Sequence, residues 1–389
     1  MWRARVTSGL AVLLAGCVLA GCWSQSEVND VAMLTVVALD RTPEGQYRWS
    51  VVVPAPEEVT PPPLSGGGGS PSRAGGSIRT ATGPSPVIAA EALETVIPRE
   101  VRWSHADHIL VGEETARSGL RRVLDFASRR YQIERRSHLY VTRGEASKVL
   151  DRFHPALERS LARSFDNISR RLRPGTVIPV DVNTFLRWLG TPGLDPHLPV
   201  VKPVTQPRGT VIPEPSGIAL FRGDRLVGFV EPPADRGLLF LRGEMPPFTL
   251  QAPCPDGSAS REATVALQVY KTRSRVQTSD DGHGPQARVR IAAEADVFEW
   301  RCREGPNPES AARVARAAAA EIRREAQLAL KVIRDLGVDP VGFGNTLHRT
   351  NPQAWHGVED RWPELLADLP ITLDVRFKLR SYGMTNRAP

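Results

Sequence analysis

The sequence predicts an α+β protein of about three mixed α/β domains. Between residues 31 and 189, short apolar runs rich in β-branched residues alternate with amphipathic stretches of helical period, which predicts helices packed on a mixed sheet. Three alternating stretches between residues 249 and 300 are separated by turn signals, and a long helical pattern follows at 308–336. We therefore expect the C-terminal part to be an antiparallel meander packed by a long helix. With 389 residues, the chain can build several cores.

Residues 1–21 have the pattern of a lipoprotein signal peptide. Two arginines make a short basic start, and the apolar run that follows ends at residue 20, which is too short to span a bilayer. The Leu-Ala-Gly-Cys sequence that ends at Cys22 resembles the bacterial lipobox, in which the thiol receives a diacylglyceryl group and the cysteine becomes residue one. The same spelling ends at Cys17, so the motif alone does not choose between them. We favour Cys22, because cleavage at Cys17 would leave a cramped apolar region; an ordinary secretory signal is the alternative.

The charge of the chain argues against a nucleic-acid partner. The formal charge is +7, and removing the two signal arginines leaves the mature chain near +5. Arginine supplies nearly all of the positive charge, and no basic stretch interleaves with aromatic residues that could stack on bases. The positive charge suits an anionic membrane surface nearby.

The first elements after the signal read as a hairpin followed by a long loop. Residues 31–39 and 47–53 are apolar and β-branched, and residues 40–46 between them read as a turn. Residues 54–77 contain proline, glycine and serine with hardly an apolar side chain, which predicts a disordered loop. We place this loop inside a domain, since the hairpin before it is too small to be stable alone.

Helices and strands alternate from residue 78 to residue 189. Ser85-Pro86 supplies an N-cap and a proline at the first helical position. The expected strands are 78–82, 101–111 and 137–142, and the expected helices are 86–96, 113–130, 145–153, 155–172 and 181–189. Residues 191–216 hold many prolines among few apolar residues, which indicates the boundary between the N-terminal and C-terminal halves.

The C-terminal half begins with a tight hairpin. Residues 217–221 and 226–230 flank Gly223-Asp224, a strong turn signal. The later expected elements are strands at 249–253, 263–278, 287–300 and 371–379, and a helix capped by Asn307 that stops at Gly337.

Cys254 and Cys302 fall at the same end of the expected meander. They would lie on opposite neighbours of the central strand, about 9 to 10 Å apart in a flat sheet, which is too far for a disulfide without twisting or fraying. Export makes oxidation possible. Both a disulfide and two buried thiols therefore remain open.

Histidines suggest a metal site and a catalytic site, but the sequence shows no further residues that would complete either one. His105 and His108 could bind a metal with Asp107, but no third ligand or zinc-type cysteine spacing is in reach, so local hydrogen bonding is favoured and no metal is expected. His348 stands beside Arg349 without a serine, cysteine or carboxylate motif, so helix packing is favoured over catalysis. We expect no enzyme activity and no cofactor, and a Gly-x-Ser-x-Gly motif is absent.

Several segments together resemble the Ger(x)C lipoproteins, the C-subunits of spore germinant receptors. The resemblance covers nearly the whole mature chain, and departs from the family mainly at Ser24–Ser26, where an acidic or basic residue is usual. The segments are Gly-Cys-Trp-x-x-x-Glu-Val-Asn-Asp at 21–30, Ser104-His105-x-x-His108 leading to Gly112-Glu113-Glu114, Arg236-Gly237 through Gly243, and Asp339 through Arg349 followed by Pro352, Trp355 and Trp362.

This resemblance implies an N-terminal region at 22–205 and a C-terminal domain at 213–385, with no known catalysis. It implies a lipoprotein on the outer face of a spore's inner membrane that works with transmembrane and other receptor subunits. On this reading the chain docks with its partners and has no direct small-molecule substrate. The alternative is a lipid-anchored solute-binding protein that feeds a transporter, and an exported hydrolase would need a base and nucleophile that the sequence does not present.

Overall fold

The computed structural model describes residues 30–53, 77–129, 133–151, 161–170, 178–207, 211–256 and 264–381. The lipidation candidates Cys17 and Cys22 lie outside these ranges, as does the predicted loop apart from Ser77. Within the described ranges, no helix combines the length and the apolar composition that crossing a bilayer requires.

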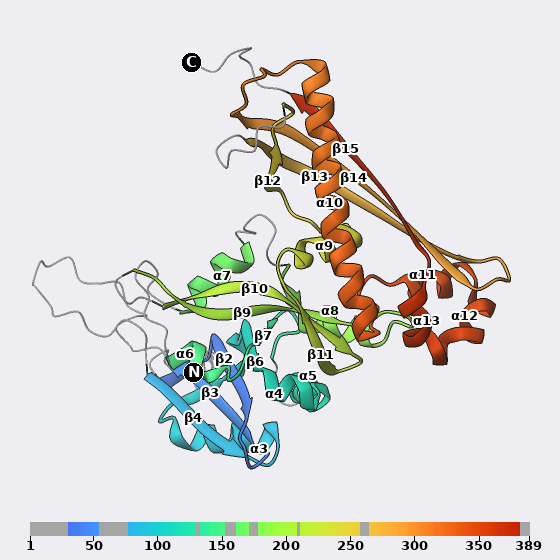
Figure 1. Ribbon diagram of the computed structural model, residues 1–389. Coiled ribbons are helices and arrows are strands. Elements are labelled where there is room, and N and C mark those ends of the chain that lie inside the picture. Colours follow the sequence, from blue (N-terminus) through green and yellow to red (C-terminus); the bar gives the residue numbers. More distant parts are fainter. Residues whose placement is uncertain are drawn as a thin grey trace, which may run out of the picture.

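A nine-stranded sheet and a four-stranded sheet organise the described chain, and a small two-stranded sheet pairs β1 with β5. Figure 1 shows the four-stranded sheet and the long helix α10 extending away from the nine-stranded sheet. The mixture of helices with three sheets confirms the α+β prediction.

The large sheet has the strand order β11-β10-β9-β7-β6-β2-β3-β4, with β8 paired to β7. Its central strands β2, β6, β7 and β9 run parallel. The strands are β2 (Val36–Arg41), β3 (Tyr47–Val53), β4 (Ser77–Gly83), β6 (His108–Gly112), β7 (His138–Thr142), β8 (Val180–Asp181), β9 (His197–Thr205), β10 (Val211–Arg222) and β11 (Arg225–Val230); the small sheet has β1 (Val31–Met33) and β5 (Glu100–Arg102).

Helices cover both faces of this sheet, so its central strands are buried on both sides. On one face Trp49 packs against Trp103 and Phe126, and on the other Tyr140 packs against Phe165. This arrangement explains the continuous apolar runs in the sequence, because both faces of a strand must then be apolar. The helices of this part are α3 (Pro86–Val96), η2 (Trp103–His105), α4 (Glu113–Ser118), α5 (Arg121–Arg129), α6 (Ser147–Asp151), α7 (Leu161–Arg170) and α8 (Val182–Leu189).

Three expected elements are divided in the structure. Residues 31–39 form β1 and β2, residues 101–111 form β5, η2 and β6, and residues 113–130 form α4 and α5 rather than one helix. The last division occurs at Gly119, whose φ of +109° ends α4. The backbone amides of Leu120 and Arg121 then bond to the carbonyl and the carboxylate of Asp224, a distant partner that the helical pattern could not indicate.

The proline-rich stretch 191–216, interpreted above as a boundary, contains strands of the large sheet. Pro203 on β9 pairs with Pro213 on β10, and Pro215 lies two residues further along β10. In this region each strand has a neighbour on one side only, because β7 pairs with β9 at residues 200–201 and β11 pairs with β10 from residue 218. Proline is tolerated there because its missing N–H faces the unpaired edge.

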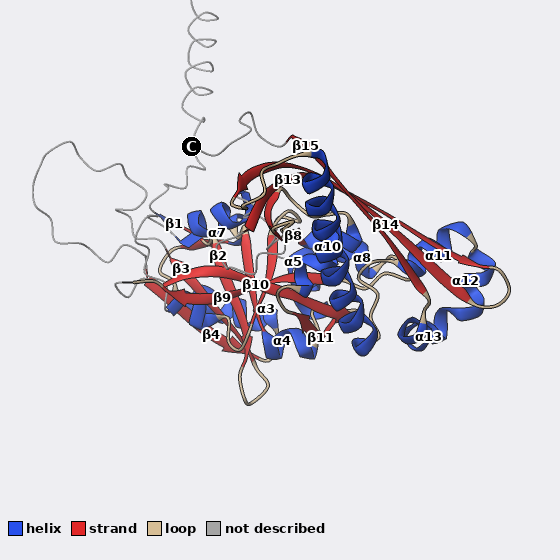
Figure 2. Ribbon diagram, turned by 45° about the horizontal axis from the view of Figure 1, so that its top comes forward, coloured by secondary structure: helices blue, strands red, loops and turns tan. Residues whose placement is uncertain are grey.

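The four-stranded sheet has the order β12-β13-β14-β15. The first three strands form the expected antiparallel meander, and β15 adds parallel to β14. Figure 2 shows α10 alongside these strands, with α11 to α13 gathered at their far end. The elements are α9 (Ala234–Arg242), β12 (Phe248–Pro253), β13 (Thr264–Asp280), β14 (Pro285–Trp300), α10 (Pro308–Leu336), α11 (Phe343–Thr350), α12 (Pro352–Val358), η3 (Glu359–Arg361), α13 (Trp362–Asp368) and β15 (Ile371–Ser381).

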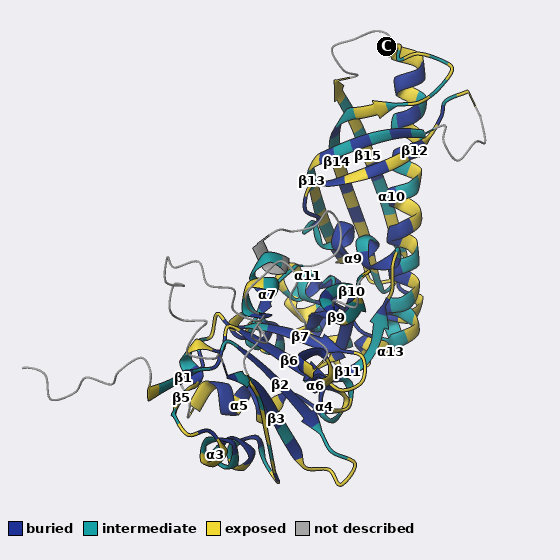
Figure 3. Ribbon diagram, turned by 90° about the vertical axis from the view of Figure 1, so that its left-hand side faces the viewer, coloured by how far each residue is buried: buried dark blue, intermediate teal, exposed yellow. Residues whose placement is uncertain are grey.

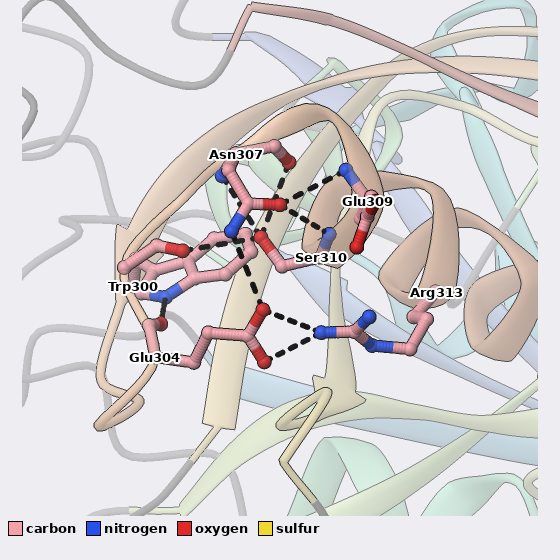
Figure 4. Close-up of polar contacts among 7 residues, drawn as sticks. Trp300, Glu304, Asn307, Glu309, Ser310 and Arg313 are labelled. Carbon is pink, nitrogen blue, oxygen red and sulfur yellow. Dashed lines mark hydrogen bonds and ion pairs between the residues drawn. The ribbon is translucent and has the colours of Figure 1, made fainter.

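The start of α10 is held by a reciprocal capping box. The side chain of Asn307 accepts hydrogen bonds from the amides of Glu309 and Ser310, and the Ser310 hydroxyl accepts one from the Asn307 amide. Figure 4 shows this cap beside the ion pair of Glu304 with Arg313. The cap satisfies amides that the first helical turn leaves free, which is why Asn307-Pro308 marks the boundary in the sequence.

A disulfide joins Cys254 to Cys302, with a Cα–Cα distance of 5.6 Å. Of the two alternatives that the sequence left open, the structure has the disulfide, and the wide separation that holds for a flat sheet does not apply here. Both cysteines follow the ends of their strands, since β12 ends at Pro253 and β14 ends at Trp300. Beyond those ends strand spacing no longer holds the backbones apart, and the thiols meet.

Candidate functional site

A polar junction around Asp339 connects the two large sheets. Asp339 is 1% exposed, and its carboxylate accepts hydrogen bonds from the amides of Gly342 at 2.7 Å and Gly344 at 2.8 Å. The indole of Trp362 donates a third, at 3.1 Å. Burial raises the pKa of Asp339 to about 6, while these donors act in the opposite direction. The carboxylate thus fixes the start of α11 and its packing on α13.

Asp195 connects the turn around Asp339 to the nine-stranded sheet. Its side chain accepts hydrogen bonds from the amide of Asp339 at 2.8 Å and from the amide of Gly223 at 3.4 Å. The backbones of residues 195 and 339 are also bonded, with a nitrogen–oxygen distance of 2.9 Å. A Cβ atom added at Gly193 would lie 2.4 Å from the carbonyl carbon of Gly344, so the two backbones are in direct contact. The family-like segment from Asp339 to Arg349 therefore lies at the junction of the two sheets.

Arg242 at the end of α9 provides a second connection. Its guanidinium pairs with Glu244, donates to the carbonyl of Pro340 and lies 5.0 Å from the ring centre of Trp188. Trp188 stacks on the buried His197, with ring centres 4.5 Å apart. Burial, followed by the charge of Arg242, lowers the pKa of His197 well below its ordinary value. A neutral imidazole therefore packs beneath the arginine.

The motif Arg236-Gly237 lies where α9 crosses α10. Arg236 forms an ion pair with Glu325, whose side chain is fully buried. Burial raises the pKa of Glu325 to about 7, and the arginine opposes that rise. This pair joins two helices that are 89 residues apart in sequence, so its role in the structure is to orient α9 on α10.

A cavity of about 560 Å³, lined mostly by polar and charged residues, lies at the carboxyl ends of the parallel strands β2, β6 and β7, where Gly112-Glu113-Glu114 begins α4. Asp40 at the base of the cavity accepts hydrogen bonds from the amides of Ala146 at 2.6 Å and Ser147 at 2.9 Å. Gly112 is required there, because a Cβ atom would lie 2.2 Å from the Asp40 carboxylate. Sheets of this kind bind ligands at such an edge, although the charged rim of this cavity carries both signs. The rim includes Arg41, Arg117, Glu145 and Lys148.

The candidate metal histidines lie in different environments. His108 is buried on β6, with Nε2 3.1 Å from a carboxylate oxygen of Asp166, whereas His105 and Asp107 are exposed. Burial lowers the pKa of His108 to about 4, with Asp166 opposing the change. No cluster of three or more metal-ligating side chains occurs among the residues that the structure places.

His348 lies on α11 against the ring of Trp355, with ring centres 6.3 Å apart. Its Nδ1 atom is buried and makes no hydrogen bond within the described chain. This environment corresponds to the packing role expected from the sequence.

The fold and the junction define a class of protein: a two-sheet α+β chain in which buried carboxylates and an arginine join a mixed sheet to a helix-backed sheet. Two family models match successive parts of it. Residues 24–203 match the spore germination protein N-terminal domain, and residues 216–383 match the spore germination B3/GerAC-like C-terminal region. The chain therefore belongs to the GerAC/B3 family of spore germination proteins.

Individual relatives are similar over almost the whole chain. The putative spore germination protein YfkR of Bacillus subtilis (strain 168) is 25% identical over 377 residues, covering 92% of each chain. Spore germination protein KC of the same strain is 23% identical, covering 96% of this chain and 95% of that protein. The crystal structure of the GerBC protein aligns with a TM-score of 0.57 at 16% identity, covering 90% of this chain and 99% of GerBC, which supports the fold.

The segments that resemble the family contain one side of each junction but not the other. Asp339, Gly342 and Arg236 lie in segments singled out by the family resemblance, whereas Asp195 and Glu325 were not recognised. Asp195 lies in a proline-rich stretch. Glu325 did carry a signal, because it falls on the buried stripe of α10 between Ile322 and Ala329.

Proposed function

We propose that this protein is a membrane-anchored lipoprotein subunit of a nutrient germinant receptor, required for spore germination. It is attached through Cys22 to the outer face of the spore's inner membrane, and it acts by docking with the transmembrane and other subunits of the receptor. The observation that carries this proposal is the match of both family models, in order, over residues 24–383 with a single short gap. Two acyl chains would confine the protein to the membrane surface, where effective concentration replaces much of the affinity that docking needs.

A docking role is favoured over catalysis because the segments that resemble the family have structural roles. Gly112 admits the carboxylate of Asp40, Arg236 orients α9, and the turn at Gly342 joins the sheets. The names of the matched relatives describe germination and no reaction. Such residues preserve the shape of a docking protein.

The anchor is tested by replacing each candidate cysteine separately. Cys22→Ala should abolish labelling by a tagged fatty acid and prevent germination, whereas Cys17→Ala, the matched control, should retain both. Label lost only in Cys17→Ala would transfer the assignment to Cys17. Full germination by an exported but unlabelled Cys22→Ala protein would refute the anchored docking model.

If the protein instead binds a solute, the cavity near Asp40 is the candidate binding site. Calorimetry on a fragment that begins at Trp23 should detect no nutrient affinity if the chain acts by docking. Micromolar binding that is lost when Arg117, on the cavity rim, is replaced by glutamine would favour a solute-binding protein instead.

A further inference from the structure

One face of the four-stranded sheet carries no helix within the described chain. α10 and α9 pack on the other face, where residues such as Val289, Ile291 and Ala293 are buried. Side chains between these positions point the opposite way, because successive residues of a strand alternate between faces. Figure 3 shows the resulting bands of buried and exposed residues along β14. We call this second side the open face.

The open face is strongly basic. Strand register brings Arg275, Arg290 and Asp374 into one row across β13, β14 and β15, and Arg273, Ala292 and Arg376 into the next. On this face of the three strands, eight basic side chains stand against four acidic ones, an excess of four positive charges. The basic residues are Lys271, Arg273, Arg275, Arg288, Arg290, Arg376, Lys378 and Arg380, and the acidic residues are Glu294, Asp296, Glu299 and Asp374.

Five of these eight basic side chains, Lys378 among them, form no ion pair with any residue that the structure describes. Glu294 pairs with Lys271 and Arg380, and Asp374 pairs with Arg376, which is still 80% exposed. The other four of the five, Arg273, Arg275, Arg288 and Arg290, are exposed. Neighbouring guanidinium groups on a sheet repel one another. An anionic partner would remove that repulsion.

Exposed aromatic side chains lie on the same strands. Phe298 on β14 is 77% exposed, and Tyr270 on β13 is 41% exposed and interacts with Arg380. Aromatic rings beside arginine and lysine are typical of surfaces that rest in the interfacial region of a bilayer, where the ring leaves water and the cations meet phosphate.

We propose that the open face binds the surface of an anionic phospholipid membrane. The charges are spread in two dimensions over three strands, which matches a broad headgroup surface better than an acidic peptide or a nucleic acid strand, each of which needs a groove or a linear track. In Figure 3, α10 lies along one side of the sheet and β1, the first described strand, lies toward the other. A membrane against the open face would therefore be on the side of the molecule toward which β1 lies.

Membrane binding by the open face is separate from the lipid attachment proposed at Cys22, and its test does not require that anchor. The fragment that begins at Trp23 lacks both lipidation candidates and retains every described element, since these begin at Asp30. Its binding is measured by co-sedimentation with vesicles of phosphatidylcholine alone and with vesicles containing 30 mol % phosphatidylglycerol, in low and high salt.

We expect binding only to the phosphatidylglycerol vesicles, and we expect it to weaken as salt rises. The triple variant Arg273→Gln, Arg275→Gln, Arg290→Gln should lower the partition coefficient by about 100-fold, given the usual contribution of each basic residue near an anionic surface. The matched control removes the same charge from the exposed side of α10 through Arg316→Gln, Arg323→Gln and Lys331→Gln. All six residues are exposed, so both variants should keep the melting temperature of the parent.

Loss of vesicle binding in the first triple variant but not in the control supports the proposal. No binding to phosphatidylglycerol vesicles at low salt would overturn it and would leave an acidic protein surface as the occupant. An equal loss in both triple variants would also overturn it, because binding would then depend on net charge rather than on this face. Neither result would bear on whether Cys22 is lipidated.

Discussion

Gly237 on α9 lies so close to Glu325 on α10 that a Cβ atom added at residue 237 would stand 1.9 Å from the Glu325 carbonyl oxygen. The neighbouring Arg236 forms its ion pair with the side chain of the same glutamate. Glu325 therefore contacts α9 in two ways: its backbone lies against Gly237, and its side chain pairs with Arg236. The two helices can cross at this distance only because residue 237 has no side chain.

Gly237→Ala should consequently destabilise the protein by about 3 kcal/mol, because the obstructing atom belongs to a helix backbone and cannot move aside locally. Chemical denaturation measures this change. The matched control is Gly357→Ala on α12, where nothing lies within 4 Å of the new methyl group. That substitution should be neutral or stabilising by less than about 1 kcal/mol. Equal stabilities of the two variants would contradict the close approach.

Asp339 should make the stability of the protein depend on pH. Burial raises its folded-state pKa from the ordinary value of 3.8 to about 6. Between these values the folded state binds more protons than the unfolded state, so the free energy of unfolding falls as pH rises. A change of this size corresponds to about 3 kcal/mol, present in full below pH 3.8 and lost above pH 6.

The measurement is the unfolding free energy at pH 4 and pH 7 for the parent and for Asp339→Asn. His108, whose pKa is lowered to about 4, contributes with the opposite sign but in both proteins, so it cancels in the comparison. The parent should lose more stability than the variant between the two pH values. Parallel pH profiles would mean that the carboxyl of Asp339 does not titrate in this range.

The disulfide should stabilise the C-terminal sheet. Cys254 and Cys302 are 48 residues apart, and closing a loop of that length constrains the unfolded chain by about 4 kcal/mol. The double variant Cys254→Ser, Cys302→Ser should lose about this amount in denaturation. Parent protein treated with a reductant serves as the control, and its stability should match that of the double variant. A reductant effect that persists in the double variant would point to another cause.

The segment between β3 and β4 should be replaceable by a short turn. Val53 at the end of β3 pairs directly with Ser77 at the start of β4. Two residues such as Asn-Gly connect strand ends in that register, and loop-closure cost changes slowly with length. Replacing residues 54–76 by Asn-Gly should therefore leave the melting temperature within a few degrees. A larger fall would show that residues 54–76 contribute packing that the strands need.

Local features of the sequence determined most of the elements. The N-caps Ser85 and Asn307 and the hairpin at Gly223 each lie where the pattern predicted them. These signals can be recognised in the sequence because the interacting residues are only a few positions apart, so one short stretch contains the whole interaction. The 29 residues of α10 were predictable for a related reason, since a helix repeats its apolar stripe every few residues.

Only the tertiary structure decided how distant stretches combine. Asp195 meets Asp339 across 144 residues, and Arg236 meets Glu325 across 89, contacts whose geometry depends on how the whole chain folds. The parallel placement of β15 beside β14 likewise follows a path through four helices. The basic open face belongs to the same category. Along each strand these arginines simply alternate with residues that face the core. They form one surface only because strand register places them side by side.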